Sequence, residues 1–161
     1  AHWFNQQYMQ SKDNVELTDL YIPILKEKGV LKDHEFVLKV VSFIKERAVF
    51  VTDFWELSSF FFEAPIEFEA KASKKNWKEG TPELMRSVAL FISNIEVFSS
   101  ENTEKEVKEW ITNKEVGFGK VMQPLRLSLV GKLAGPHLFD IIAMIGKQET
   151  VKRIENAINK L

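Results

Sequence analysis

Apolar residues recur three and four positions apart along nearly the whole chain, which is the spacing of one buried face of an α-helix. No segment alternates apolar and polar residues over the length of a β-strand. The pattern therefore predicts an all-α protein, and the short loops between its helices favour antiparallel neighbours.

Three helices are expected in the first part of the chain. The first spans about residues 17–28, the second begins at Asp33 and ends in the polar group 45–47, and a short third one runs from Thr52, a suitable N-cap, to about residue 62. Arg47 therefore lies at the end of a helix. The apolar residues expected on the buried faces are Leu20, Tyr21, Ile24, Leu25, Phe36, Val37, Val40, Val41, Ile44, Phe54, Leu57 and Phe61.

Residues 65–80 show weak periodicity and mix lysines with glutamates, which is typical of a connector. We therefore expect a helical subdomain over residues 1–64, a connector over 65–80 and a second helical subdomain over 81–161. Thr81, followed by a proline, marks the start of a helix as its cap, and Thr103 with Glu106 fits a capping box for the next helix, which should end before Gly117. Further stripes at helical spacing are Phe118, Val121, Met122, Leu125, Leu129 and Leu133, then Leu138, Ile141, Ile142 and Ile145, then Val151, Ile154, Ile158 and Leu161.

Composition narrows the class of protein. With 161 residues, of which 45% are hydrophobic and 12% aromatic, the chain can bury the core of one domain or of two small ones. It has no cysteine, which excludes disulfides and thiolate metal sites and favours the reducing cytoplasm. No apolar run approaches the roughly 18 residues that cross a bilayer, and the first residues lack a signal-peptide pattern, so we expect no membrane partner.

The net charge of -1 limits how the chain could bind nucleic acid. A protein that holds nucleic acid chiefly by bulk attraction to phosphates usually presents a basic surface. Any RNA contact by this chain should therefore be local and directed at bases.

No group of residues in the sequence suits catalysis. The histidines, His2, His34 and His137, are widely spaced and form no metal-ligand motif. The glycines at 117 and 119 lack the Gly-x-x-x-x-Gly-Lys-Ser/Thr spacing of a phosphate loop. We therefore predict neither a metal nor a catalytic residue in this chain.

Four blocks of sequence resemble the glutamyl-tRNA synthetases of bacterial type. They are Trp-Phe-Asn-Gln-Gln-Tyr at 3–8, Gly-Lys-Val-Met-Gln-Pro-Leu-Arg-Leu-Ser-Leu-Val-Gly at 119–131, Gly-Pro-His-Leu-Phe-Asp-Ile at 135–141 and Ile-Gly-Lys-Gln-Glu-Thr at 145–150. They are similar, in the same order, to the carboxy-terminal anticodon-binding region of that family. His137 departs from the family pattern, and residues 65–78 match no motif of it.

The resemblance implies a cage of two packed helical subdomains that binds the anticodon loop of glutamate tRNA and acts as a monomer. The family's catalytic signatures, a His-Ile-Gly-His-like element and a Lys-Met-Ser-Lys-Ser-like loop, are missing. It therefore implies that a parent enzyme ligates glutamate to the tRNA with ATP and Mg in another domain, and that this region itself holds no cofactor.

The resemblance also implies which residues contact the anticodon: Arg47, Gln123, Arg126, Leu138 and Phe139. Guanidinium groups suit this role, because they present a rigid fork of donors to base edges and phosphates and can stack on a base. Arg47 matches a position at which family members that reject glutamine tRNA favour C over G as the last anticodon base. The resemblance thus predicts a discriminating enzyme.

Two further interpretations stay open. The lysines of the expected connector, together with one in the second subdomain, could contact the tRNA backbone, although such a cluster is more often simply solvated. They are Lys71, Lys74, Lys75, Lys78 and Lys120. The near-neutral charge and the apolar helix faces also suit a helical protein-interaction module that binds no RNA. The interpretation as an enzyme that uses an acidic pair such as Asp53 and Glu56 is poorly supported, because neither a base nor a nucleophile accompanies the pair.

Overall fold

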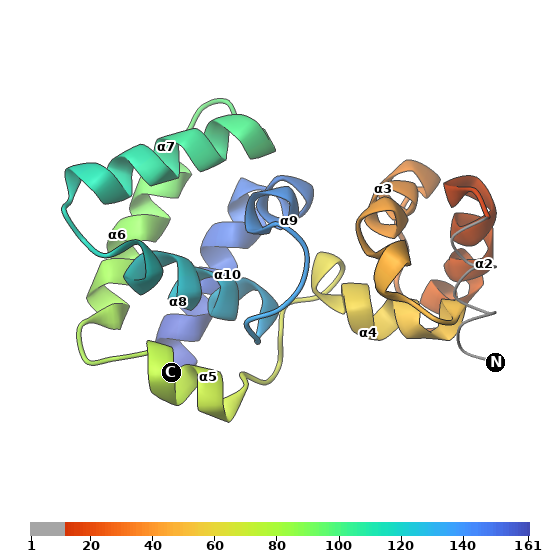
Figure 1. Ribbon diagram of the computed structural model, residues 1–161, viewed down its shortest axis with the longest axis horizontal. Helices are drawn as coiled ribbons and strands as arrows, with labels where there is room; N and C mark the ends of the chain where they lie inside the picture. The colour runs from red at the N-terminus through yellow and green to blue at the C-terminus, as the bar shows by residue number, and fades with distance from the viewer. Residues whose placement is uncertain (1–11) are drawn as a thin grey trace. The chain divides into compact units, whose positions relative to one another are not determined.

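The computed structural model describes residues 12–161, and within that range the chain consists of helices and turns, with no β-strand (Figure 1). The all-α prediction is confirmed. The chain divides into two compact units, Ala1–Glu63 and Ala64–Leu161. Among the described helices none is both long and apolar enough to cross a membrane.

Two helices of the first unit pack against each other, α2 (Asn14–Glu27) and α3 (His34–Ile44). Each begins at an aspartate, because the carboxylates of Asp13 and Asp33 accept hydrogen bonds of 2.8 Å from backbone amides of the first turn. The buried face of α3 agrees with the prediction, whereas that of α2 differs. Leu20 is 48% exposed and Leu17 is buried instead.

The predicted helix 52–62 is broken into three pieces: η2 (Val51–Asp53), α4 (Phe54–Ser58) and η3 (Ser59–Phe61). Thr52 is not its cap. The Asp53 carboxylate instead accepts hydrogen bonds from the amides of Val49 and Phe50, at 3.0 and 2.8 Å, and so closes the turn before the helix.

Tyr21 and Ser58 bring polar groups into the core of the first unit. The Tyr21 ring meets Phe54 edge to face at 5.2 Å, and its hydroxyl lies 2.7 Å from the Oγ of Ser58, which in turn donates to the Phe54 carbonyl. Burial raises the pKa of Tyr21 to about 12, against a smaller lowering by the Ser58 hydrogen bond. The phenol is therefore a neutral part of the core.

The second unit contains α5 (Ala70–Asn76), α6 (Thr81–Ser93), α7 (Ser100–Asn113), α8 (Phe118–Val130), α9 (Leu138–Ile145) and α10 (Lys147–Lys160). The helix α10 runs through the middle of this unit, in contact with α6, α8 and α9, and α7 packs on α8 and α9 (Figure 1). The buried faces of α8 and α10 follow the predicted stripes in their centres. At their ends Phe118 and Leu161 are exposed.

Two predicted helix starts are wrong by part of a turn or more. Thr81 is the first helical residue rather than the cap, and its hydroxyl accepts a hydrogen bond from the Lys78 amide at 2.8 Å. The helix α7 begins at a cap on Ser99, whose hydroxyl accepts from the Asn102 amide, so Thr103 lies buried inside the helix. At α7 the Ser99 hydroxyl thus closes the helix end before the predicted cap, whereas α6 begins after Gly80 without a side-chain cap.

The expected connector contains the helix α5 and is anchored to the end of α8. The helix α8 ends at Gly131, which has a φ of +85°. Its carbonyl accepts a hydrogen bond of 2.8 Å from the Glu69 amide, and a Cβ on this glycine would lie 2.7 Å from the Glu67 carbonyl oxygen. Only glycine suits this contact, because it combines a left-handed backbone with the absence of a side chain.

Candidate nucleic-acid interface

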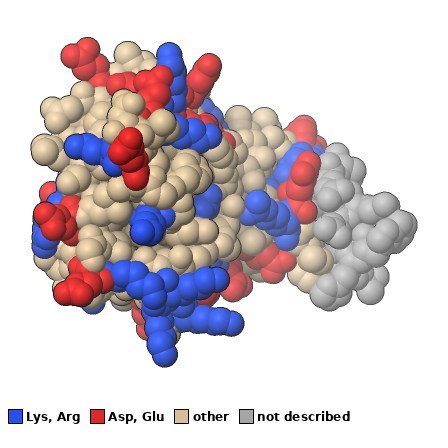
Figure 2. Space-filling model, turned by 60° about the vertical axis from the view of Figure 1, so that its left-hand side comes forward, with Lys and Arg blue, Asp and Glu red and all other residues tan. Residues whose placement is uncertain are grey.

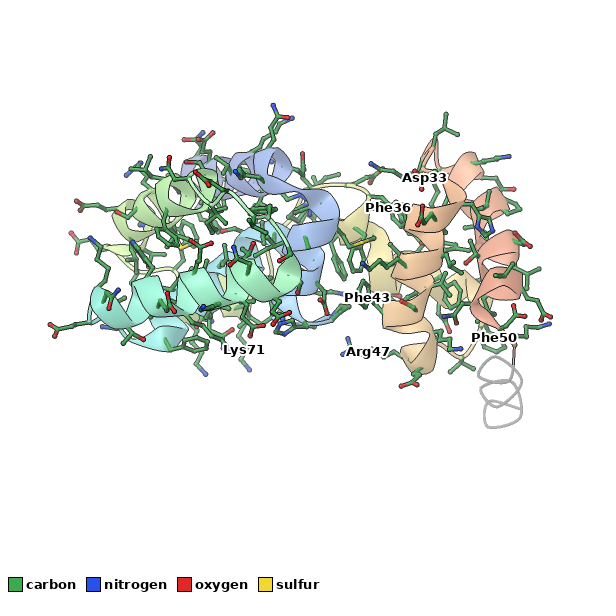
Figure 3. All side chains as sticks on the ribbon, turned by 90° about the horizontal axis from the view of Figure 1, so that it is seen from above. Asp33, Phe36, Phe43, Arg47, Phe50 and Lys71 are labelled. Atoms are coloured by element: carbon green, nitrogen blue, oxygen red, sulfur yellow. The ribbon has the colours of Figure 1, made fainter. Side chains whose placement is uncertain are left out.

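Arg47 lies at the end of α3, in the 3₁₀ turn η1 (Lys45–Arg47), and Figure 3 shows it beyond the end of α3 that lies opposite Asp33 and Phe36. It is exposed, and its side chain makes no hydrogen bond or ion pair with any described residue. The backbone around it is held by the buried Ala48 and by the Asp53 carboxylate. An exposed guanidinium on a fixed turn is available to a ligand.

Gln123 and Arg126 both lie on α8, one turn apart. Gln123 is exposed, whereas Arg126 is half-buried and its Nη1 donates a hydrogen bond of 3.1 Å to the Ala134 carbonyl. Arg126 therefore ties the loop that follows α8 back onto the helix. The Arg126 guanidinium therefore has a structural role in the protein alone, without RNA.

Leu138 and Phe139 form the start of α9, and they are only 2% and 1% exposed. Their side chains belong to the core of the second unit and present almost no surface to a ligand. No side chain caps this helix, so the amides of its first residues are the groups that can face outward.

An ionic cluster holds the start of α9 against α7. His137 Nε2 lies 2.9 Å from Glu104, and Lys108 Nζ lies 2.6 Å from the same carboxylate. The hydrogen bonds from Lys108 and His137 hold the pKa of the Glu104 carboxyl below its usual value. Beside them, Ser100 donates a hydrogen bond of 2.7 Å to Asp140. The residue that departs from the family pattern, His137, thus has a structural partner.

The candidate backbone-binding lysines gather around α5. Lys71, Lys74 and Lys75 lie on this helix, Lys78 follows it, and all of them are exposed, as is Lys120 on α8. Figure 2 shows basic side chains gathered at the lower edge of the face that it presents, the edge at which α5 lies in Figure 1. The charge of this region is therefore local, although the whole chain is close to neutral.

A buried arginine of α10, Arg153, holds the end of α8, and the sequence pattern did not reveal it. Arg153 on α10 is 2% exposed and donates hydrogen bonds of 2.8 Å to the Leu129 carbonyl and to Glu149. Burial lowers the pKa of Arg153, while the Glu149 carboxylate opposes that effect. The only signal in the sequence is a glutamate four residues before an arginine on the otherwise apolar stripe of a helix.

Comparison with known families decides the class. A family model described as an anticodon binding domain matches residues 16–158, which is nearly the whole chain. The chain belongs to this anticodon-binding domain family.

Relatives of this anticodon-binding domain include the glutamate–tRNA ligases of Flavobacterium psychrophilum and Flavobacterium johnsoniae, each 54% identical over 99% of this chain. A crystal structure of a glutamate tRNA ligase from Elizabethkingia meningosepticum, in complex with its amino acid, matches 99% of the chain with a TM-score of 0.93 and 43% identity. The ligase structure from Elizabethkingia anophelis gives a TM-score of 0.87 and 42% identity over 98% of the chain. The chain spans about a third of the length of these relatives, 32% in the first of them.

These matches confirm the family and the helical fold that the sequence motifs implied. Within the second unit of the anticodon-binding domain, Gln123 and Arg126 share one helix, and the lysines surround α5. Within residues 12–161 no group of three or more Asp, Glu, His or Cys side chains is placed to hold a metal ion. The roles of the individual residues toward RNA remain predictions.

Proposed function

We propose that this anticodon-binding domain reads the anticodon loop of glutamate tRNA, as part of a cytoplasmic enzyme that ligates glutamate to that tRNA with ATP and Mg in another domain. The observation that carries the proposal is the family match over residues 16–158 together with 54% identity to proteins named glutamate–tRNA ligase. The near-neutral charge supports reading by local contacts rather than by bulk attraction.

Arg47 is the proposed reader of the last anticodon base. Its exposure and its lack of an internal partner among the described residues leave the whole guanidinium fork available to the acceptor atoms of a cytosine. A guanine at that place offers a different arrangement of donors and acceptors. Arg47 would therefore favour tRNAs that end their anticodon in C over those that end in G.

Gln123 and Arg126 are the proposed contacts of the second unit. The Gln123 amide offers both a donor and an acceptor to a base edge. Arg126, which holds the loop through Ala134, lies one turn further along the same helix. Because the Leu138 and Phe139 side chains are buried, we assign them to supporting the start of α9, whose amides can face the RNA. The lysines around α5 would position the RNA backbone and carry no sequence preference.

The test is binding of the chain to glutamate-tRNA anticodon stem-loops that end the anticodon in C or in G, at one fixed low salt concentration. The loop with C should bind roughly tenfold or more tightly, as expected for one good base contact. Arg47→Ala should remove this preference, whereas Arg86→Ala, which changes another exposed arginine, should keep it.

Equal binding of both loops by the unaltered chain would contradict the role of Arg47 alone. Absence of binding to either loop would contradict anticodon reading by this chain and would favour a helical module that binds protein.

A further inference from the structure

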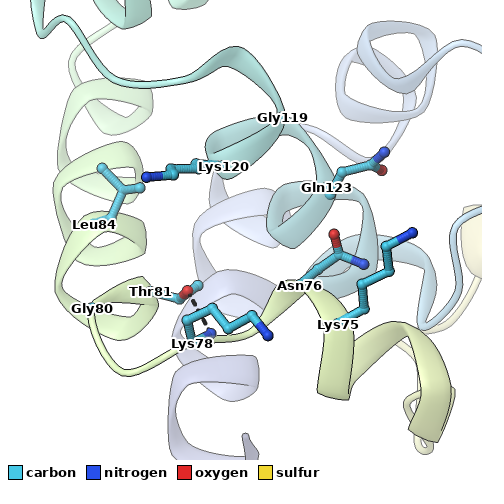
Figure 4. Close-up of a pocket in the computed structure, with 9 residues that line it drawn as sticks. All are labelled: Lys75, Asn76, Lys78, Gly80, Thr81, Leu84, Gly119, Lys120 and Gln123. Atoms are coloured by element: carbon cyan, nitrogen blue, oxygen red, sulfur yellow. Dashed lines mark hydrogen bonds between the residues drawn. The ribbon is translucent and has the colours of Figure 1, made fainter.

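A cavity of about 500 Å³ opens in the second unit between α5, α6 and α8. Figure 4 shows Lys120 of α8 pointing toward Leu84 of α6, with Asn76 and Lys75 of α5 on the other side. This volume lies in the range of cavities that hold small ligands. The described residues that line it are Lys75, Asn76, Lys78, Gly80, Thr81, Leu84, Gly119, Lys120 and Gln123.

The charge of the cavity is of one sign. Three of its described lining residues, Lys75, Lys78 and Lys120, are lysines and none is Asp or Glu. The first turns of α6 and α8 contribute Thr81 and Gly119 to its wall, and neither helix start has a side-chain cap. The start of α8 contributes most of these free amides, because in α6 the Thr81 amide donates to the Lys78 carbonyl and the next residue is a proline. Free amides at a helix start favour an anion, as the lysines do.

The uncharged part of the wall suits a flat heterocycle. Leu84, the aliphatic stems of the lysines and two glycines give an apolar surface. The amides of Asn76 and Gln123 add groups that can pair with a base edge. Asn76 Nδ2 donates to the Ala72 carbonyl at 2.9 Å, and Figure 4 shows its Oδ1 directed toward α8. Gln123 makes no hydrogen bond through its side chain to any described residue.

The glycines keep the cavity open. A Cβ built on Gly80 or on Gly119 would meet no atom within 4 Å, and neither residue has a positive φ. Backbone geometry therefore does not require glycine at either place. Gly119 in the first turn of a helix is unfavourable by itself, since alanine would be a better helix former. Gly80 and Gly119 leave the space next to their backbone open to the cavity.

We propose that this cavity holds one unstacked nucleotide of the anticodon loop, with its base against Leu84 and the glycines and its phosphate among Lys75, Lys78 and Lys120. The inference rests on the proposed binding of glutamate tRNA. In this proposal α5 and the start of α6 form a pocket for a nucleotide, and their role is more specific than a general attraction to the RNA backbone. Unpaired bases in loops are recognised in this way, by insertion and edge contacts.

The absence of cysteine from the chain allows a direct test. A single thiol introduced by Gly119→Cys lies in the cavity wall, and its alkylation by iodoacetamide can be timed with and without the stem-loop. At a stem-loop concentration about ten times Kd, the alkylation rate should fall roughly tenfold, since only the unbound fraction reacts. The control Glu109→Cys, exposed on α7, should react at an unchanged rate.

A filling variant gives the second readout. Gly119→Leu should reduce stem-loop affinity by about tenfold or more, which corresponds to loss of one inserted base, while Gly119→Ala should have a smaller effect. Urea unfolding of both variants should show stability equal to or above that of the original chain, because the position is helical and has open space.

The outcomes separate the two proposals. A stem-loop that binds while the thiol at position 119 stays fully reactive would overturn the nucleotide pocket and leave anticodon reading in place. Protection by UMP or CMP alone, with none by the stem-loop, would assign the cavity to a free nucleotide and also overturn the inference. Absence of any stem-loop binding would remove the proposed function itself, and the pocket for a loop nucleotide with it.

Discussion

The guanidinium of Arg153 on α10 donates a hydrogen bond of 2.8 Å to the backbone carbonyl of Leu129 on α8, and both residues are buried. The carbonyl belongs to the last turn of α8, where helical carbonyls lack a partner within their own helix. A charged side chain of the central helix thus completes the end of the helix that carries Gln123 and Arg126.

Replacement of Arg153 should therefore lower stability strongly. Arg153→Ala removes the partner of the Leu129 carbonyl and leaves a cavity, and we expect a loss of about 3 kcal/mol in the free energy of unfolding. Urea denaturation of both proteins measures it. Lys152→Ala, on the exposed side of the same helix, should change stability by no more than about 0.5 kcal/mol. Similar values for the two variants would contradict a structural role of the buried guanidinium.

Gly119 in the first turn of α8 and Gly131 at its C-cap should respond in opposite ways to the same change. Gly131→Ala should cost roughly 2 kcal/mol or more, because φ is +85° and the added Cβ would lie 2.7 Å from the Glu67 carbonyl oxygen. Gly119→Ala should instead stabilise the chain by about 0.5–1 kcal/mol, since it relieves the entropic cost of glycine within a helix. Thermal or urea unfolding of the pair checks both signs. A neutral Gly131→Ala would show that residues 65–67 can move aside cheaply.

The lysines of α5 that lie outside the cavity should act through charge alone. The double variant Lys71→Ala with Lys74→Ala should weaken binding of the C-ending and G-ending stem-loops by the same factor. The slope of log K against log salt should also become shallower by about 0.7 for each phosphate of single-stranded RNA that the variant no longer neutralises. Lys105→Ala with Lys152→Ala is the matched control for charge. A change in the preference between the two loops would mean that these lysines read sequence.

The Glu104 cluster should make stability depend on pH in one direction. The folded pKa of this carboxyl lies below its ordinary value of 4.5, mainly because Lys108 and His137 donate hydrogen bonds to it. Its contribution is therefore complete above pH 4.5 and is lost as the pH falls through the lower folded pKa.

Glu104→Gln tests this effect. At neutral pH we expect a loss of about 0.5 kcal/mol, the scale of an ion pair near the surface, and the difference between the two proteins should vanish in acid. Unfolding curves at several pH values measure the difference. A gap that stays constant down to acid pH would assign the effect to packing rather than to the charge.

The helical spans were predictable because the apolar stripes are long, as in α3 and α8. The helix α5 was missed because it is short and buries only Ala72, so it leaves almost no periodic signal. Helix starts were less predictable, since several capping residues lie close together and compete. Ser99 closes α7 one turn ahead of Thr103, which then lies inside the helix.

The candidate site was only partly predictable for a related reason. A helix end in sequence led correctly to an exposed Arg47. At the start of α9, however, the apolar stripe and the resemblance disagreed about Leu138, and the structure buries both Leu138 and Phe139. The cavity beside α5 forms where α8 meets α5 and α6, which are distant from it in sequence, so no single motif predicts it.

The hydrogen bond from Arg126 to the Ala134 carbonyl has a consequence for how RNA binding at this residue would be measured. If a base or phosphate competes for the same guanidinium nitrogen, recognition becomes an exchange, in which one acceptor replaces another. The affinity then reports only the difference between the two acceptors, and the heat released is small even when the new contact is strong. The loop after α8, relieved of its tether, would gain motion at the moment the anticodon is held, so part of the signal of recognition would appear as increased amide exchange in residues that never touch the RNA.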